Sequence, residues 1–436
     1  MSEHGAQLHP RTDEGENRPL SVSARLGRLQ FHHSGKFRVL QFADIQDGPN
    51  VSKDTILLIR AALEAARPDV VIFTGNQIAG YDAAYAATYR KRRWQTPNPR
   101  PNSPEAKRRQ ADLEKTRETV RAQIAKFVQP LIDAGVPWAV TYGNHDFQCG
   151  LDNAELDEIY RGFEGCLNGD ASLCGDDLME FEMSKTLPDQ YVYACEPGTF
   201  ALPVSDAEHR HTVIGLVLLD SGDYARAGGY GSPSARGLEF LRKLPAKLGH
   251  DVESIVFQHT AMPQYYQLLK PVSPTTAHAI EGYRMFAGQY YALDEDRADP
   301  GSYVGEGVSC PDNDAGEFAV LHDTHGYFAV AAGHDHRNAF SGRVEGVKLI
   351  ETPTAGFESY GPVPAKRAAR LFEFDIRHPY DPRTQLLEYG DIVGKPSSKK
   401  AYVYGMTAAS KSESEGVDLL HRPSWFARVL DRILQR

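Results

Sequence analysis

The chain has 436 residues, of which 41% are hydrophobic, 10% aromatic and 24% charged, values that are typical of a globular protein. A formal net charge of −10 argues against nonspecific attraction to a phosphate backbone, so we predict no nucleic-acid partner. The N-terminal region lacks the apolar segment of a secretory signal, and no apolar run approaches the roughly 20 residues that span a bilayer. The five cysteines are an odd number without paired metal-ligand spacing, and we expect reduced thiols in a cytoplasmic protein.

The first ordered elements are predicted after a polar N-terminal segment. Residues 1–25 show no apolar periodicity and predict a flexible tail, whereas a single large domain is expected over residues 30–394. The apolar run Phe37–Ala43 predicts a buried strand, and Ser52 can cap the helix that follows it. A second apolar run, Val70–Thr74, completes a β-α-β unit. Such a crossover predicts a parallel sheet and an α/β fold.

Further apolar strands alternate with three polar insertions. The insertions are expected near residues 85–110, 147–190 and 285–318; the first is basic and proline-rich, and the second carries three cysteines with little periodicity. A long helical segment follows the first insertion and ends near Asp133. The further predicted strands are Val136–Tyr142, Val213–Leu219, Ile255–Gln258, Tyr327–Ala332, Val347–Ile350 and Leu371–Asp375.

The chain ends in a linker and an amphipathic segment. Residues 395–417 are rich in serine and lysine and predict a linker, and residues 418–436 predict a C-terminal helix with Ser424 as its cap. Apolar side chains recur at helical spacing in that helix, with three arginines elsewhere on it. We favour packing of the apolar stripe on the protein's own body. The alternatives are an anionic membrane surface and a partner's groove.

Metal-compatible side chains follow five of the predicted strands. Imidazole and carboxylate groups bind divalent transition metals, and an amide oxygen can fill a remaining position. Any one of these residues could be a helix cap or a turn residue. Five such loops in order, each after an apolar strand, instead predict one metal site at the carboxyl ends of the strands. The residues are Asp44, Gln46, Asn76, Asn144, His145, Asp146, His259, His334 and His336.

The order of these loops resembles the calcineurin-like metallophosphoesterases. The family pattern is D-x-H, G-D, G-N-H-D/E, a lone H and then G-H-x-H, and the resemblance covers roughly residues 36–376. The segments Leu219–Tyr224, Gln258–Pro263 and Gly305–Val308 resemble a branch called purple-acid-phosphatase-29-like or Dcr2-like. The resemblance implies a four-layer α/β/β/α sandwich of two mixed sheets. It also implies a hydrolase acting on phosphoric esters.

The resemblance also implies a role for each site residue. Divalent Mn, Fe or Zn is expected, as one or two ions. One ion would be held by Asp44, Gln46 and His336 and the other by Asn144, His259 and His334, with Asn76 between them; His145 would face the phosphate and be oriented by Asp146. Two such ions could activate a bridging hydroxide, and His145 could protonate the leaving oxygen.

Two positions depart from the family pattern. Gln46 replaces the histidine of D-x-H, and Asn76 replaces the bridging aspartate. A neutral amide offsets less positive charge than a carboxylate does, so we expect the site with Asn144 to bind its ion more tightly. Asp47 is near enough in sequence to compensate. Purple acid phosphatases owe their colour to a tyrosine that binds ferric iron. The corresponding position in this chain is Ala79, so we expect no ferric-tyrosinate centre.

The motifs are compatible with three functions. The leading interpretation is hydrolysis of phosphomonoesters by a metal-activated hydroxide, with a phosphorylated small molecule or protein as substrate. A phosphodiesterase is the second interpretation, because the same motifs serve both reactions. The third is a catalytically impaired fold that binds a phosphorylated ligand without turnover, which Gln46 and Asn76 favour. The motifs do not specify the substrate, whose recognition is expected in the insertions.

Overall fold

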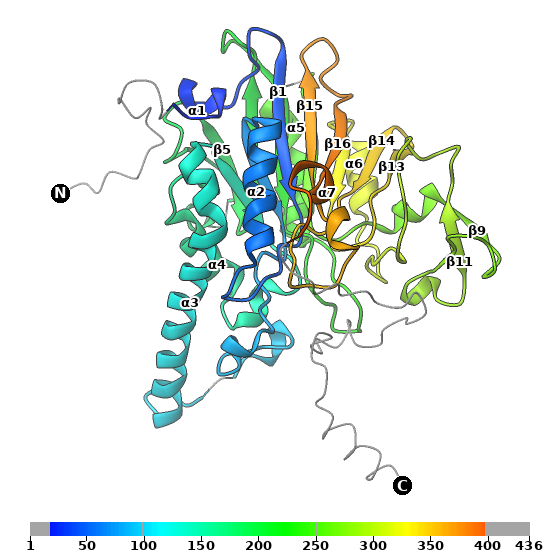
Figure 1. The fold of residues 1–436 in the computed structure, drawn as a ribbon. Helices are drawn as coiled ribbons and strands as arrows, with labels where there is room; N and C mark the ends of the chain where they lie inside the picture. The colour runs from blue at the N-terminus through cyan, green and yellow to red at the C-terminus, as the bar shows by residue number, and fades with distance from the viewer. Residues whose placement is uncertain (1–17, 98, 176, 250, 397–436) are drawn as a thin grey trace.

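Two large β-sheets form the centre of the computed structural model, which describes residues 18–396 except residues 98, 176 and 250 (Figure 1). The first sheet has the strand order β16-β15-β1-β2-β3, and the second has the order β13-β14-β12-β8-β7-β6-β5-β4. Both sheets are mixed: β1, β2 and β3 are parallel, as are β7, β8, β12 and β14, and antiparallel strands flank each group.

The strands of the first sheet are β1 (Lys36–Phe42), β2 (Val70–Thr74), β3 (Trp138–Thr141), β15 (Ala368–Asp375) and β16 (Arg383–Glu388). Those of the second sheet are β4 (Glu180–Met183), β5 (Tyr191–Glu196), β6 (Thr199–Ser205), β7 (Thr212–Leu219), β8 (Glu253–Gln258), β12 (Tyr327–Ala332), β13 (Ser341–Val344) and β14 (Val347–Glu351). A small third sheet contains β9 (Leu269–Val272), β10 (Ile280–Glu281) and β11 (Tyr290–Leu293).

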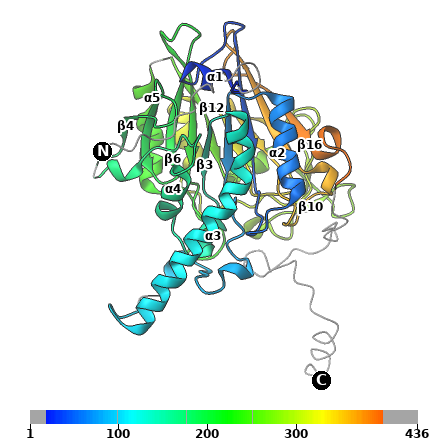
Figure 2. The same ribbon diagram turned by 60° about the vertical axis from the view of Figure 1, so that its left-hand side comes forward.

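Helices cover the outer faces of the two sheets. The helices are α1 (Val22–Leu26), α2 (Lys53–Ala66), α3 (Pro104–Ala134), α4 (Asn153–Arg161), α5 (Ala235–Leu248), α6 (Glu317–Asp323) and α7 (Tyr389–Ile392). Ser52 caps α2 as predicted, its side chain accepting a hydrogen bond from Asp54 N–H. The N-terminal part of α3 projects well beyond the body of the protein (Figure 2).

Three hydrophobic cores separate four layers. Within β1, Phe37 and Val39 face the core between the two sheets, whereas Leu40 and Phe42 face the core under α2 and α3. This alternation is the period of a strand with both faces buried. The third core lies between the second sheet and α5 and α6. The predicted α/β/β/α sandwich is therefore confirmed.

Two expectations about the chain's organisation need revision, and a third is not tested by the described residues. The N-terminal tail was expected over residues 1–25, but α1 begins at Val22, and Ser21 Oγ donates to the Asp69 carbonyl oxygen. The segment 147–190 was expected to be loop-rich, yet it contains α4 with a complete capping box between Asp152 and Glu155. The predicted linker and C-terminal helix lie outside the described residues.

Candidate metal centre

The loops that follow β1, β2 and β12 contain residues in left-handed backbone conformations that non-glycine residues rarely adopt. Asp44, Gln46, Asn76 and His334 all have positive φ, at 51°, 40°, 52° and 70°. Non-glycine residues with positive φ are uncommon, and they often lie at functional sites. The four fall in three separate loops that meet at the carboxyl ends of the parallel strands. This concentration marks the predicted site independently of residue chemistry.

Two glycines allow these loops to approach one another closely. A Cβ atom on Gly75 would lie 2.6 Å from the His259 ring, and one on Gly143 would lie 2.4 Å from Asn76 Oδ1. Side chains at either position would push two loops of the site apart. Gly75 also has a φ of 84°, which favours glycine on conformational grounds.

Three atoms that can act as metal ligands converge in the group formed by Asn144, His259 and His334. His259 Nε2 lies 3.0 Å from Asn144 Oδ1 and 3.1 Å from His334 Nδ1. All three side chains are buried, and burial lowers the pKa of both histidines, which keeps them neutral. His259 Nδ1 lies 2.9 Å from the Thr74 carbonyl oxygen and must donate its hydrogen there.

The tautomer of His259 decides what this group can bind. With its hydrogen on Nδ1, the Nε2 atom of His259 presents a lone pair to the Asn144 carbonyl oxygen. Without a metal, His334 Nδ1–H can donate to this lone pair; with the hydrogen of His334 on Nε2 instead, all three atoms present lone pairs to one point. The three donor atoms therefore suit a divalent metal ion, with two imidazole nitrogens and one amide oxygen as ligands. Among the described residues, no metal-binding group consists of three or more His, Cys, Asp or Glu side chains.

Asp44 and His336 form a second pair of candidate ligands, and Gln46 follows Asp44 in the same loop. His336 Nε2 lies 3.3 Å from Asp44 Oδ1, and His336 Nδ1 donates to the Tyr360 carbonyl oxygen at 2.6 Å. Burial opposes ionisation of Asp44, but the neighbouring His336 lowers the pKa of this carboxyl below its ordinary value through its charge and a hydrogen bond. Gln46 Oε1 is buried and has no hydrogen-bond partner among the described residues. An anionic oxygen, an imidazole and an unsatisfied amide oxygen also fit a cation.

Asn76 lies between the two groups and presents its amide nitrogen to them. Its Nδ2 atom donates to Asp44 Oδ1 at 3.2 Å and to Asn144 Oδ1 at 3.1 Å. Its Oδ1 atom accepts a hydrogen bond from His145 N–H at 2.8 Å. Turning the amide over would set oxygen against oxygen and N–H against N–H. In this arrangement Asn76 offers no oxygen to bridge two ions, which differs from the role expected for it.

His145 is oriented by a residue other than the one expected. Asp146 was expected to hold the imidazole, but its carboxylate accepts hydrogen bonds from the backbone N–H groups of Asn76, Ile78 and Gly143. These bonds join two site loops, so Asp146 shapes the backbone. The His145 Nδ1 atom instead lies 2.7 Å from Gln148 Oε1. Burial lowers the pKa of His145 to about 4, so the imidazole is neutral near pH 7.

Asp47 is not available to replace a metal ligand. Its carboxylate accepts hydrogen bonds from Ser52 N–H, the Thr55 hydroxyl and Glu358 N–H. Tyr81 does reach the site, although its position in the sequence does not match that of the family's tyrosine. Its hydroxyl accepts a hydrogen bond from Gln46 Nε2 at 3.0 Å, and its ring packs edge-on against His145 at 4.8 Å.

Several aromatic residues around the histidines were not predicted. Tyr360 stacks on His336 with ring centroids 4.1 Å apart, and Tyr230 packs edge-on against His334 at 4.3 Å. The Tyr224 hydroxyl accepts a hydrogen bond from Asn144 Nδ2 at 2.8 Å. Of these, only Tyr224 lies in a segment that the family resemblance singled out. The others contact the site through distant loops, which short sequence motifs do not report.

Comparisons with known proteins identify the family of this chain. A family model described as calcineurin-like phosphoesterase matches residues 37–338. The chain is 21% identical to "Probable inactive purple acid phosphatase 29" of Arabidopsis thaliana over 382 residues, or 82% of each protein. It is 23% identical to "Phosphatase DCR2" of Saccharomyces cerevisiae over 349 residues, 74% of this chain and 47% of that protein. A solved dimetal phosphatase from Danio rerio is 14% identical, with a TM-score of 0.39 over 81% of this chain and 99% of that one.

Proposed function

Because the chain belongs to the calcineurin-like phosphoesterase family, we propose that it hydrolyses phosphomonoesters with a divalent ion held by Asn144, His259 and His334. The observation that carries this proposal is the hydrogen bond of His259 Nδ1 to the Thr74 carbonyl oxygen, which directs the Nε2 lone pair at the Asn144 oxygen. When bound, a Mn, Fe or Zn ion would supply positive charge that neutralises phosphoryl oxygens and favours attack by water. Asp44, His336 and Gln46 would form a second, weaker site.

The chain's own residues would position the phosphoryl group and manage its proton. Gln148 holds Nδ1 of His145, which leaves Nε2 as the atom that can accept or return a proton. Asp146 and Asn76 fix the backbone that carries His145. His145 would act as the general acid only after a substrate dianion raises its pKa from about 4.

One observation favours a second candidate function, which is binding without turnover. Asn76 places N–H groups where the family pattern has a bridging carboxylate, so it removes one negative charge from between the two groups of donors. A phosphorylated ligand could still bind to one ion and to His145. The word "inactive" in the name of the Arabidopsis relative is consistent with this candidate, whereas the name of the yeast relative specifies a phosphatase.

Hydrolysis assays with defined metal content would separate these functions. The purified protein should be stripped with a chelator, reloaded separately with Mn, Fe or Zn, and given a generic phosphomonoester and a generic diester. We expect metal-dependent release of phosphate from the monoester. Binding of inorganic phosphate to the loaded protein without hydrolysis of either ester would refute phosphatase activity and support the binding function.

The described residues give two further observations that bear on location. None of the helices in this part of the chain combines the length and apolar character needed to cross a bilayer. All five cysteines are buried and unpaired, and burial raises the pKa of the Cys149 thiol to about 12. Free thiols are typical of a reducing compartment, which supports a cytoplasmic location as part of this proposal.

A further inference from the structure

The side-chain amide of Asn144 can serve as a metal ligand only with its oxygen facing the histidines. Asn144 is fully buried, so both ends of the amide need partners within the protein. Its Oδ1 atom lies 3.0 Å from His259 Nε2 and accepts a hydrogen bond from Asn76 Nδ2 at 3.1 Å. Its Nδ2 atom donates to the Tyr224 hydroxyl at 2.8 Å. One of the partners that orient the amide therefore lies outside the family's ligand pattern.

The Tyr224 hydroxyl favours the orientation of the amide that suits a metal ion. Without this hydroxyl, the Asn144 nitrogen would be a buried donor that has lost its acceptor, which costs free energy. In the metal-free protein the amide could then turn over and direct an N–H group at the lone pair of His259 Nε2. Metal binding would have to reverse that turn. Loss of the hydroxyl should therefore weaken the binding of metal.

Aromatic neighbours hold the Tyr224 ring in place. Tyr230 stacks on it with ring centroids 5.8 Å apart, and Phe147 packs edge-on against it at 6.4 Å. Tyr230 also packs against the ring of His334 at 4.3 Å, so the same cluster contacts a second candidate ligand. All of these contacts are between rings. A phenylalanine at position 224 would keep them and lose only the hydroxyl.

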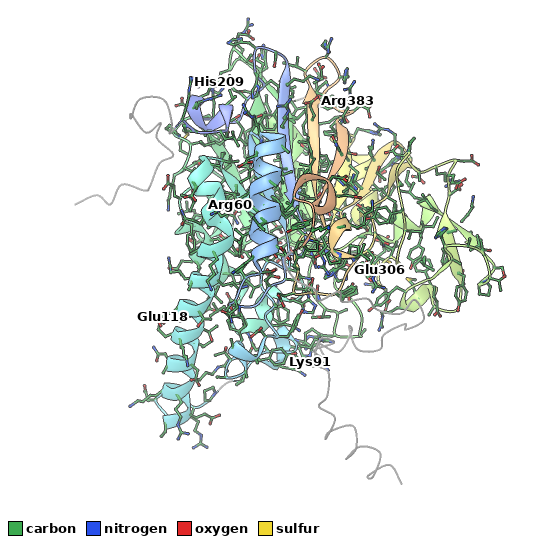
Figure 3. All side chains as sticks on the ribbon, viewed as in Figure 1. Arg60, Lys91, Glu118, His209, Glu306 and Arg383 are labelled. Carbon is green, nitrogen blue, oxygen red and sulfur yellow. The ribbon has the colours of Figure 1, made fainter. Side chains whose placement is uncertain are left out.

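The basic insertion adds two contacts that fix the segment of Tyr224. The guanidinium carbon of Arg92 lies 3.8 Å from the centroid of the Tyr224 ring, in a cation–π contact. Arg93 forms an ion pair with Asp223, the residue before Tyr224. Figure 3 shows Lys91, which precedes both arginines, beyond the lower end of the sheets. The insertion therefore contributes to the position of the tyrosine.

We propose that Tyr224 is a positioning residue that sets the Asn144 amide for metal binding. This inference rests on the proposed function, because it concerns the ion that the proposed phosphatase would use. The hydroxyl accepts a hydrogen bond from the amide nitrogen and leaves the amide oxygen for the ion. That hydrogen bond would be strengthened when the amide oxygen binds a cation. The inference also gives a function to the end of the segment Leu219–Tyr224, which resembles one branch of the family.

Calorimetric titration of the metal-free, full-length protein with Mn²⁺ tests this inference without requiring turnover. The Tyr224→Phe variant should bind Mn²⁺ at the tight site about tenfold more weakly than wild type, as expected for loss of one buried hydrogen bond. Tyr389→Phe is a matched control, because the Tyr389 hydroxyl is also buried and donates to Asp54 on α2, likewise at 2.8 Å. The control should bind Mn²⁺ as wild type does, and equal weakening in both variants would overturn the inference.

A double-mutant cycle with Asn144→Asp separates orientation of the ligand from packing around it. A carboxylate has two equivalent oxygens, so an oxygen faces the ion whichever way the group is turned. In the Asn144→Asp background, Tyr224→Phe should therefore change the Mn²⁺ affinity by less than about twofold. Equal weakening in both backgrounds would show that the hydroxyl acts through packing alone and would overturn the inference.

The outcomes also separate this inference from the proposed function. If the wild-type protein binds Mn²⁺ and hydrolyses monoesters, but Tyr224→Phe binds Mn²⁺ equally well, the inference is wrong and the phosphatase stands. Weaker Mn²⁺ binding by Tyr224→Phe only in the Asn144 background, without hydrolysis of any ester by wild type, would support the inference and refute the phosphatase. Absence of Mn²⁺ binding by the wild-type protein would overturn both.

Discussion

The Asn76→Asp substitution should make the protein less stable without metal and more dependent on metal for its stability. The wild-type amide donates to the Asp44 carboxylate at 3.2 Å and to the Asn144 amide oxygen at 3.1 Å. Loss of a hydrogen bond to a charged group costs about 1.5–3 kcal/mol and loss of a neutral one about 0.5–1.5 kcal/mol. The substitution should therefore lower the free energy of unfolding of the metal-free protein by about 3 kcal/mol.

Charge repulsion adds to this loss. A carboxylate oxygen about 3 Å from Asp44 would meet a repulsion of roughly 5 kcal/mol at an effective dielectric constant near 20. Uptake of a proton by one of the two acids relieves part of it. A bound divalent ion would make the new carboxylate stabilising instead of destabilising, because its oxygen would then be a metal ligand. Metal at 100 times its dissociation constant would restore about 2.7 kcal/mol.

The assay is denaturant unfolding with chelator and with saturating metal. Asn168→Asp is a matched control, because Asn168 Nδ2 is also buried and donates to a carboxylate, that of Asp157, at 2.8 Å. The control should lose stability in a similar way, but metal should not restore it. An Asn76→Asp variant that is as stable as wild type in chelator, or that gains no more from metal than wild type does, would refute the reasoning.

Adding a second substitution to Asn76→Asp tests whether the two amides limit phosphatase activity. The double change Gln46→His with Asn76→Asp restores both ligands of the family pattern, and it should raise metal content toward two equivalents and increase phosphatase activity. A gain below about threefold corresponds to well under 1 kcal/mol of transition-state stabilisation. Such a small gain would show that the two amides do not limit the reaction.

Four other predictions follow from the site. Metal analysis after dialysis should find closer to one equivalent of metal than two. The His259→Ala substitution should abolish this binding. Two tightly held equivalents in the wild-type protein would contradict the prediction of a single tight site. His145→Ala should lower kcat by about 10²–10⁴-fold with the metal content intact, and an unchanged rate would remove His145 from the mechanism. Tyr81→Phe should lower kcat by about five- to tenfold through loss of one hydrogen bond, whereas loss of the tightly bound metal instead would make it a structural residue. Truncation after residue 420 should lower thermal stability, whereas unchanged stability with lost vesicle binding would support a membrane role for that segment.

The parts of the fold that the sequence predicts well are its buried parallel strands. β2 matches the predicted Val70–Thr74, and β12 matches Tyr327–Ala332, because strands buried on both faces appear as unbroken apolar runs. The antiparallel strands β4 and β5 were not predicted. In β4 the side chains of Phe181 and Met183 are exposed and alternate with glutamates, so the pattern resembles that of a polar loop.

The site was predicted as a set of loops more accurately than as a set of roles. Residue type and order identified Asn76 and Asp146 as site residues, and the structure places both there. Their roles depend on which atoms face which neighbours. The Asn76 amide is oriented by His145 N–H, and Asp146 is occupied by three backbone donors. A sequence records side-chain chemistry but not these backbone donors.

This difference explains how a family pattern can persist when two of its ligands are replaced. Asp146 joins the loops after β2 and β3 through hydrogen bonds to the backbone, and Asn76 adds a bond to His145 N–H. Hydrogen bonds between protein groups therefore join these loops. Replacement of the bridging aspartate by asparagine preserves this framework while it changes the charge that the centre can offset. Under the proposed function, catalysis would then depend on the lone pairs of Asn144, His259 and His334, residues that match the family pattern.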